Sequence, residues 1–144
     1  MRHKLLYEKD GARTFAVVFD TGDDVTKGLL EFAKSEKLTG SHFTAIGAFE
    51  DVELGYFDFS RKDYVQIAMK QQVEVLSLVG NVALHEGEPK LHAHVVVGLR
   101  DGHTRGGHLL QAHVRPTLEV VIEELPRQLQ RRIDSETNLP LIEL

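Results

Sequence analysis

Two histidines that lie two residues apart are the strongest chemical feature of the sequence. They stand in the run Leu91-His92-Ala93-His94-Val95. In a β-strand successive side chains alternate between the two faces, so both imidazoles would project from one face and the apolar residues from the other. Two imidazoles on one face can bind a single metal ion, and zinc accepts histidine nitrogen at about 2.0–2.1 Å. This pair predicts part of a metal site.

His108 is the candidate third ligand. It follows Gly106-Gly107, and Asp101-Gly102 has the composition of a hairpin tip that would return the chain to the first strand. An ideal two-residue turn at Asp101-Gly102 would pair His94 with Leu109 and place His108 on the wrong face. We therefore expect one extra residue in the returning strand, as a β-bulge at Gly106-Gly107, because glycine adopts the left-handed conformation that bulges often need.

The histidine pattern also has a simpler interpretation, because a His-x-His strand can face solvent without any ligand. His103 stands beside the turn glycine and is expected to be exposed. His113 has the opposite strand parity to His108, so we expect it to lie outside the site. The sequence leaves both interpretations of the histidines open.

Three carboxylates could assist a metal site. Glu74 lies in an otherwise apolar strand, Glu50 stands beside a predicted turn, and Glu119 lies in another apolar run. A carboxylate close to a metal ion acts as a general base or orients a ligand histidine. For Glu74, a solvent-facing or interface position is favoured over a buried one.

The elements that would position these residues are mostly strands. The patterning predicts an α+β fold, with an antiparallel β-sheet packed against one main helix. Lys9-Asp10-Gly11 is a hairpin turn, and the helix is expected over roughly Asp23 to Lys37. Further strands follow, interrupted by a turn at Glu50-Asp51. The chain should end with a short helix over Arg127–Ile133 and an extended segment over Leu139–Leu144.

Composition limits the classes of protein to which the chain can belong. Its 144 residues predict one domain, with a core over about residues 5–125 and a C-terminal extension over 126–144. The absence of cysteine excludes disulfides and thiolate metal sites.

The start of the chain has no apolar signal core and no apolar run is long enough for a membrane helix, so we expect a cytoplasmic protein without membrane contact. The net charge of -5 does not favour nucleic acid, and the basic cluster Arg127, Arg131 and Arg132 is expected to be a solvated face.

An ordered set of motifs over about residues 5–125 resembles the plant-and-prokaryote-conserved (PPC) domain. The resembling segments are Ala48-Phe49 with Leu54–Asp58, Glu74–Leu78 with Gly80-Asn81, His92–His94 with Asp101-Gly102 and Gly106–Leu109, and Thr117–Ile122. The resemblance implies a compact α+β domain that assembles as a homotrimer. It also implies that His92, His94 and His108 correspond to the metal ligands of the prokaryotic branch. Plant relatives join this domain to AT-hook DNA-binding segments, and the sequence contains no such Arg-Gly-Arg-Pro hook.

Three hypotheses follow for the function. The first is a regulatory or other non-catalytic PPC module: a homotrimer with one divalent ion, zinc by preference, per subunit. Its open coordination position would accept water, a small anion or a small-molecule ligand. The second is a metal-dependent enzyme of the hydrolase type, in which the bound metal activates water and Glu74 or Glu50 accepts a proton. The third is direct DNA binding, which the acidic charge disfavours.

Overall fold

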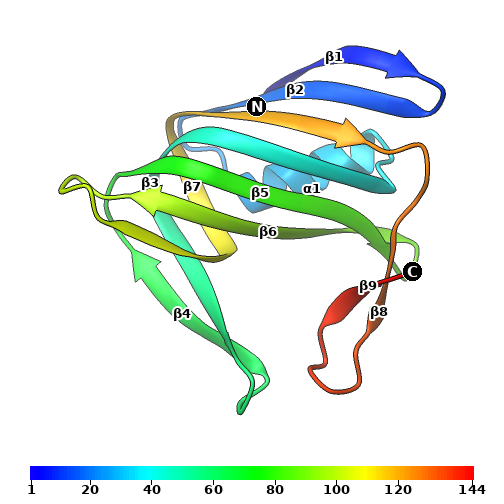
Figure 1. Cartoon of the computed structure of the whole chain (residues 1–144). Coiled ribbons are helices and arrows are strands. Elements are labelled where there is room, and N and C mark those ends of the chain that lie inside the picture. The colour runs from blue at the N-terminus through cyan, green and yellow to red at the C-terminus, as the bar shows by residue number, and fades with distance from the viewer.

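The fold is a nine-stranded, largely antiparallel sheet with one helix packed on it (Figure 1). The computed structural model describes residues 1–144. The strand order is β1-β2-β7-β3-β5-β8-β9, with β4 paired to β3 and β6 paired to β5 and β7. The elements are β1 (Arg2–Lys9), β2 (Ala12–Asp20), α1 (Val25–Ser35), β3 (Gly40–Asp58), β4 (Asp63–Met69), β5 (Val73–His85), β6 (Glu88–Gly98), β7 (Thr104–Glu124), β8 (Gln130–Ile133) and β9 (Pro140–Glu143).

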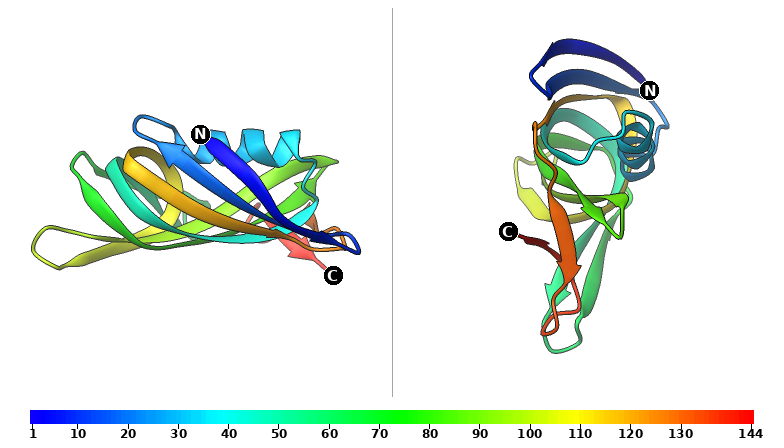
Figure 2. Two further views of the ribbon diagram at one scale, coloured as in Figure 1. Left: turned by 90° about the horizontal axis from the view of Figure 1, so that it is seen from above. Right: turned by 90° about the vertical axis from the view of Figure 1, so that its right-hand side faces the viewer.

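The helix covers one face of the sheet, as the view from above shows (Figure 2). The side chain of Asp24 caps its N-terminus by accepting a hydrogen bond from the backbone nitrogen of Lys27. Leu29 and Phe32 point into the core, where the Phe32 ring meets Phe15 of β2 edge-on at 5.3 Å between centroids. The predicted helix is confirmed, and the core lies between it and the inner face of the sheet.

Two of the strands are long, and one of them runs through a predicted turn. The predicted turn at Glu50-Asp51 is wrong, because β3 runs without interruption through it and bends at irregular pairings with β5 and β7. Strand β7 is also long, at 21 residues. Bulges let a strand bend while most of its ladder is kept, so one strand can contribute to two parts of the sheet.

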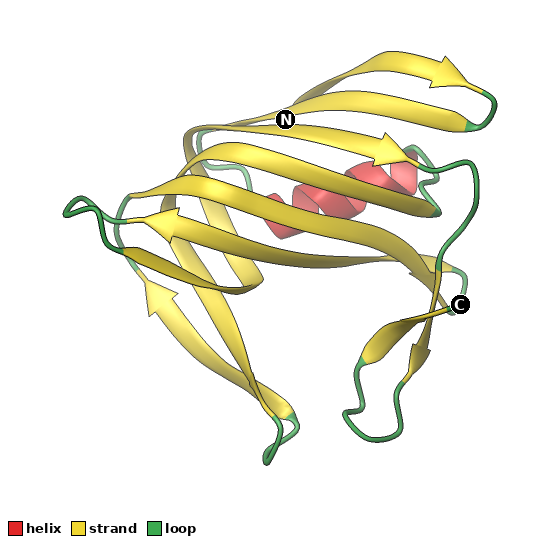
Figure 3. Cartoon of the chain, in the orientation of Figure 1, coloured by secondary structure: helices red, strands yellow, loops and turns green.

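The two ends of the chain test two local predictions with opposite results. The hairpin turn at Asp10-Gly11 is confirmed, with both residues at positive φ between β1 and β2. The predicted helix over Arg127–Ile133 is wrong, because this stretch contains strand β8, which pairs with β9 (Figure 3). A seven-residue helix is marginal by itself, whereas pairing with β5 and β9 satisfies the backbone. The extended segment at the C-terminus is confirmed as β9.

The fold is α+β, as the patterning predicts. The two histidines of β6 lie on the face of the sheet that the helix does not cover. Ala93 and Val95, which alternate with them, are buried in the core. No helix of the protein is both long and apolar enough to span a membrane.

Candidate metal centre

The hairpin between β6 and β7 brings His94 and His108 directly opposite each other. Directly paired residues of antiparallel strands point to the same face. The hairpin is closed by a three-residue loop, Arg100 to Gly102, across which the backbone nitrogen of Leu99 donates to the carbonyl of His103 at 2.8 Å. The odd loop length sets the register that the site needs, so the expected two-residue turn is wrong.

The expected bulge at Gly106-Gly107 is also absent from this hairpin. The two glycines pair regularly with Val96 and Val95. Gly107 is needed for close packing, because a Cβ there would lie 2.9 Å from the carbonyl oxygen of Gly55 on β3. Gly107 therefore lets β7 lie tightly against β3 just before His108.

The three imidazoles converge on one point. Nε2 of His92 lies 3.1 Å from Nε2 of His94, and one ring nitrogen from each of the three histidines lies within 4.8 Å of the others. Two nitrogens bound to a tetrahedral zinc ion at about 2.0–2.1 Å are about 3.3 Å apart. The spacing of the rings therefore fits a single ion of this size.

The electrostatic environment keeps two of the site rings, those of His92 and His108, in the form that binds metal. Burial, reinforced by His92 and His94, lowers the pKa of His108 to about 4. Burial also lowers the pKa of His92, with smaller contributions from His94 and Arg131. His92 and His108 are thus neutral at pH 7, as metal binding requires. Nδ1 of His108 is buried without a hydrogen-bond partner, so this ring still has a nitrogen that the chain does not satisfy.

Tyr64 of β4 holds the His108 ring from one side. The two rings are stacked with 4.7 Å between their centroids. Gly55, which pairs with His108, makes room for this contact, since a Cβ there would lie 2.7 Å from the Tyr64 ring. Nothing in the histidine motif indicates this tyrosine, because it comes from a distant strand.

The other two histidines considered from the sequence lie where it predicts. His103 is exposed beside the hairpin loop and pairs with Asp101. His113 lies outside the triad, where its Nδ1 is 2.9 Å from Oδ1 of Asp51.

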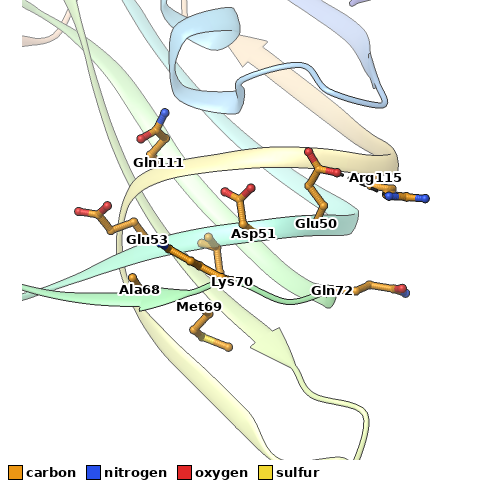
Figure 4. A pocket seen from close by; sticks show the side chains of 10 residues that line it. Glu50, Asp51, Glu53, Ala68, Met69, Lys70, Gln72, Gln111 and Arg115 are labelled. Carbon is orange, nitrogen blue, oxygen red and sulfur yellow. Dashed lines mark ion pairs between the residues drawn. The ribbon is translucent and has the colours of Figure 1, made fainter.

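None of the three candidate carboxylates lines the cavity beside the histidines. Glu50 lies in a separate polar cleft between β3, β4 and β7, of about 610 Å³, where it pairs with Arg115 at 3.8 Å (Figure 4). Glu74 and Glu119 are exposed, which agrees with the solvent-facing position favoured for Glu74. Within one chain, the site consists of histidines without an acidic partner.

Arg131 is a residue of the site that the sequence interpretation missed. Arg131 lies on β8 and is buried. The sequence pattern instead predicts a solvated face for the cluster of arginines to which it belongs. Its guanidinium donates to Oδ1 of Asn81 and to the carbonyl of Pro140. Burial lowers its pKa, but arginine stays protonated in proteins. Only the pairing of β8 with β5 brings this charge near the histidines, so no local signal could have indicated it.

Solved structures of similar proteins cover nearly the whole chain. A metal-containing protein from Archaeoglobus fulgidus is 32% identical, with a TM-score of 0.84 over 100% of this chain and 99% of its own. A PPC protein from Pyrococcus horikoshii is 29% identical, with a TM-score of 0.85 over 99% of this chain and 96% of its own. A candidate DNA-binding protein from Ralstonia eutropha is 30% identical, with a TM-score of 0.84 over 90% of each chain.

Two sequence comparisons gave different results. No curated protein is significantly similar to the chain in sequence. The sequence model of the Plants and Prokaryotes Conserved (PCC) domain, the PPC domain named above, matches residues 7–126. This match covers well over half of the chain, and the protein therefore belongs to the PPC domain family.

Proposed function

We propose that the protein is a PPC-domain module that binds one divalent metal ion per chain, zinc by preference, through His92, His94 and His108. The observation that carries the proposal is the convergence of three ring nitrogens within 4.8 Å. Three imidazole ligands leave a fourth coordination position for water or a ligand. The metal-containing relative from Archaeoglobus fulgidus supports the proposal.

The histidines favour zinc without excluding other ions, because imidazole also suits nickel, iron and copper. Elemental analysis of protein purified without a histidine tag therefore tests both stoichiometry and identity. We expect about one metal equivalent per chain in the wild type and in His103→Gln, whose histidine is exposed. The double variant His92→Gln/His94→Gln should retain less than a tenth of an equivalent.

Two results would contradict the metal proposal. One is a wild-type protein that holds no metal after equilibration with zinc and removal of the excess. The other is a double variant that retains as much metal as His103→Gln. Circular dichroism of each variant checks that a loss of metal does not reflect a loss of fold.

We further propose that the chain assembles with copies of itself, as a homotrimer, through the face of the sheet opposite the helix. Ile46, Leu76, Val79 and Val121 on this face are exposed. Val79 pairs directly with His94, so the apolar surface continues to the edge of the metal site. Burying these side chains against a second copy would remove apolar area from water.

Hydrolysis is a weaker candidate for the same site. A zinc ion bound by three histidines lowers the pKa of bound water to about 7. A hydrolase of this kind also needs a group that accepts a proton. The adjoining cavity has no carboxylate of this chain in its lining, so we place metal and ligand binding before catalysis.

DNA association is also a weaker candidate. The Ralstonia eutropha relative is described as a candidate DNA-binding protein. The net charge of this chain is -5, and phosphate contacts by lysine and arginine supply most non-specific affinity for DNA. The charge balance therefore disfavours direct DNA binding by this chain.

A further inference from the structure

A small cavity adjoins the histidine triad. Its volume is about 190 Å³, and it lies between strands β4, β6 and β7 and the β8–β9 hairpin. The lining includes two of the three site histidines and two cationic side chains, and it includes no aspartate or glutamate. The lining residues are Tyr64, Lys90, Leu91, His92, His108, Arg131, Leu139, Pro140 and Leu141.

Arg131 brings an uncompensated positive charge to this cavity. Only 8% of the residue is exposed. Its guanidinium contacts two neutral acceptors, Asn81 and the Pro140 carbonyl, while its Nε is buried without a partner. No carboxylate of the chain forms an ion pair with it, although the neighbouring Arg132 pairs with Glu143 at 2.9 Å. A buried charge without an opposite charge is unfavourable, so an anion from outside the chain would stabilise it.

The hairpin that carries Arg131 is held firmly in place. The backbone nitrogen of Leu84 on β5 donates to the carbonyl of Leu129 at 2.8 Å, and the nitrogen of Leu129 donates to the carbonyl of Thr39 at 3.0 Å. In Figure 1 the hairpin lies below β6 at the lower right, and its Arg131 lines one cavity with His92 and His108. The backbone of the hairpin and the two hydrogen bonds of the guanidinium, to Asn81 and to the Pro140 carbonyl, together preorganise the charge, which lowers the ordering cost of binding a ligand.

We propose that this cavity binds a small monocarboxylate, with its carboxylate between Arg131 and the metal ion and its short alkyl part against Leu139 and Leu141. The inference rests on the proposed metal site, because the metal ion would bind one of the two carboxylate oxygens while Arg131 binds the other. A volume of about 190 Å³ equals that of about six water molecules. The cavity thus accommodates an acid of a few carbons, and its apolar wall favours a carboxylate over an inorganic anion.

Isobutyrate and its uncharged analogue isobutyramide provide the test, because they have nearly the same shape. Calorimetric titration of zinc-loaded full-length protein should show that isobutyrate binds at least tenfold more tightly than isobutyramide. Arg131→Gln should weaken isobutyrate binding at least tenfold. The matched variant Arg132→Gln removes the exposed arginine next to it and should bind isobutyrate as the wild type does. Metal content is measured in every sample.

The outcomes separate this inference from the metal proposal. If the zinc is bound but the two probes bind equally or not at all, the carboxylate site is refuted and the metal site stands. Isobutyrate would also fail to bind if a carboxylate from a second copy of the chain already occupied the cavity, and that result likewise refutes the proposal. If the wild type holds no metal, the metal proposal fails. The carboxylate site then fails as well unless the metal-free protein still prefers isobutyrate. If Arg131→Gln does not fold, the comparison of isobutyrate with isobutyramide binding to the wild-type protein still tests the proposal.

Discussion

His108 and His113 show how the same side chain acquires opposite properties from its surroundings. His108 is partly buried and lies beside two other imidazoles, and burial with their help lowers its pKa to about 4. The pKa of His113 is raised, chiefly because it donates a hydrogen bond to Asp51, with further help from nearby carboxylates. The first environment suits a metal ligand and the second an ion pair, which links β7 to β3.

The raised pKa of His113 predicts a pH-dependent contribution to stability. The protonated ring is stabilised in the folded state. This stabilisation is therefore complete below the unfolded pKa of about 6.5 and disappears as the pH rises through the higher folded pKa. Asp51→Asn should lower the free energy of unfolding by about 0.5 kcal/mol at pH 5.5, because the pair is partly exposed, and by much less at pH 9.

Urea unfolding at the two pH values measures this difference. The control is the same Asp51→Asn change in a His113→Gln background, where the pH dependence should vanish. An equal loss of stability at both pH values would show that the contact does not depend on a charged histidine.

At the scale of elements, the close contact of β7 with β3 decides where His108 lies. Gly107 has no room for a side chain, because the Gly55 carbonyl occupies the space. The neighbouring Gly106 is less restricted, with its nearest contact at 3.2 Å from an added Cβ. The two glycines are adjacent in sequence and differ in this contact, so they form a natural pair for comparison.

Gly107→Ala should therefore destabilise the protein by about 1–3 kcal/mol, the usual cost of overpacking. It should also weaken metal binding, because β7 must move and His108 with it. Gly106→Ala should have a clearly smaller effect on both. Chemical unfolding and zinc titration measure the two quantities, and equal effects of the two variants would argue against the close contact as the cause.

At the scale of the whole molecule, the sheet has one covered face and one open face. The helix covers the core side (Figure 2), while the face that carries His94 exposes apolar side chains. Ile46 is the most exposed of those in the middle of the sheet, at 61%. Leu5 on β1 is also exposed, at 43%. It pairs directly with the core residue Phe15 and therefore points to the same face as Phe15, which is the face opposite Ile46.

Ile46→Glu should therefore dissociate the assembly, because it places a charge in the proposed interface between copies. Sedimentation should show three chains for the wild type and for Leu5→Glu, and one chain for Ile46→Glu with its circular dichroism unchanged. A wild-type monomer at micromolar concentration would refute the homotrimer. An Ile46→Glu protein that still sediments as a trimer would place the interface elsewhere.

Short-range patterns in the sequence determined a large part of this description. The two-residue period of β6 was sufficient to put His92 and His94 on one face and Ala93 and Val95 on the other, and helical periodicity was sufficient to locate α1. The hairpin turn at Asp10-Gly11 likewise follows from local backbone preference. Each of these features depends on residues a few positions apart.

The tertiary structure alone decided how separate segments meet. The three-residue loop, and not a bulge, brought His108 opposite His94, and β8 became a strand that carries Arg131 to the cavity. The sequence pattern could not settle these points, because alternation within a strand is local. Loop geometry and the register between strands instead depend on which pairing satisfies the backbone and buries the most apolar surface across the whole sheet.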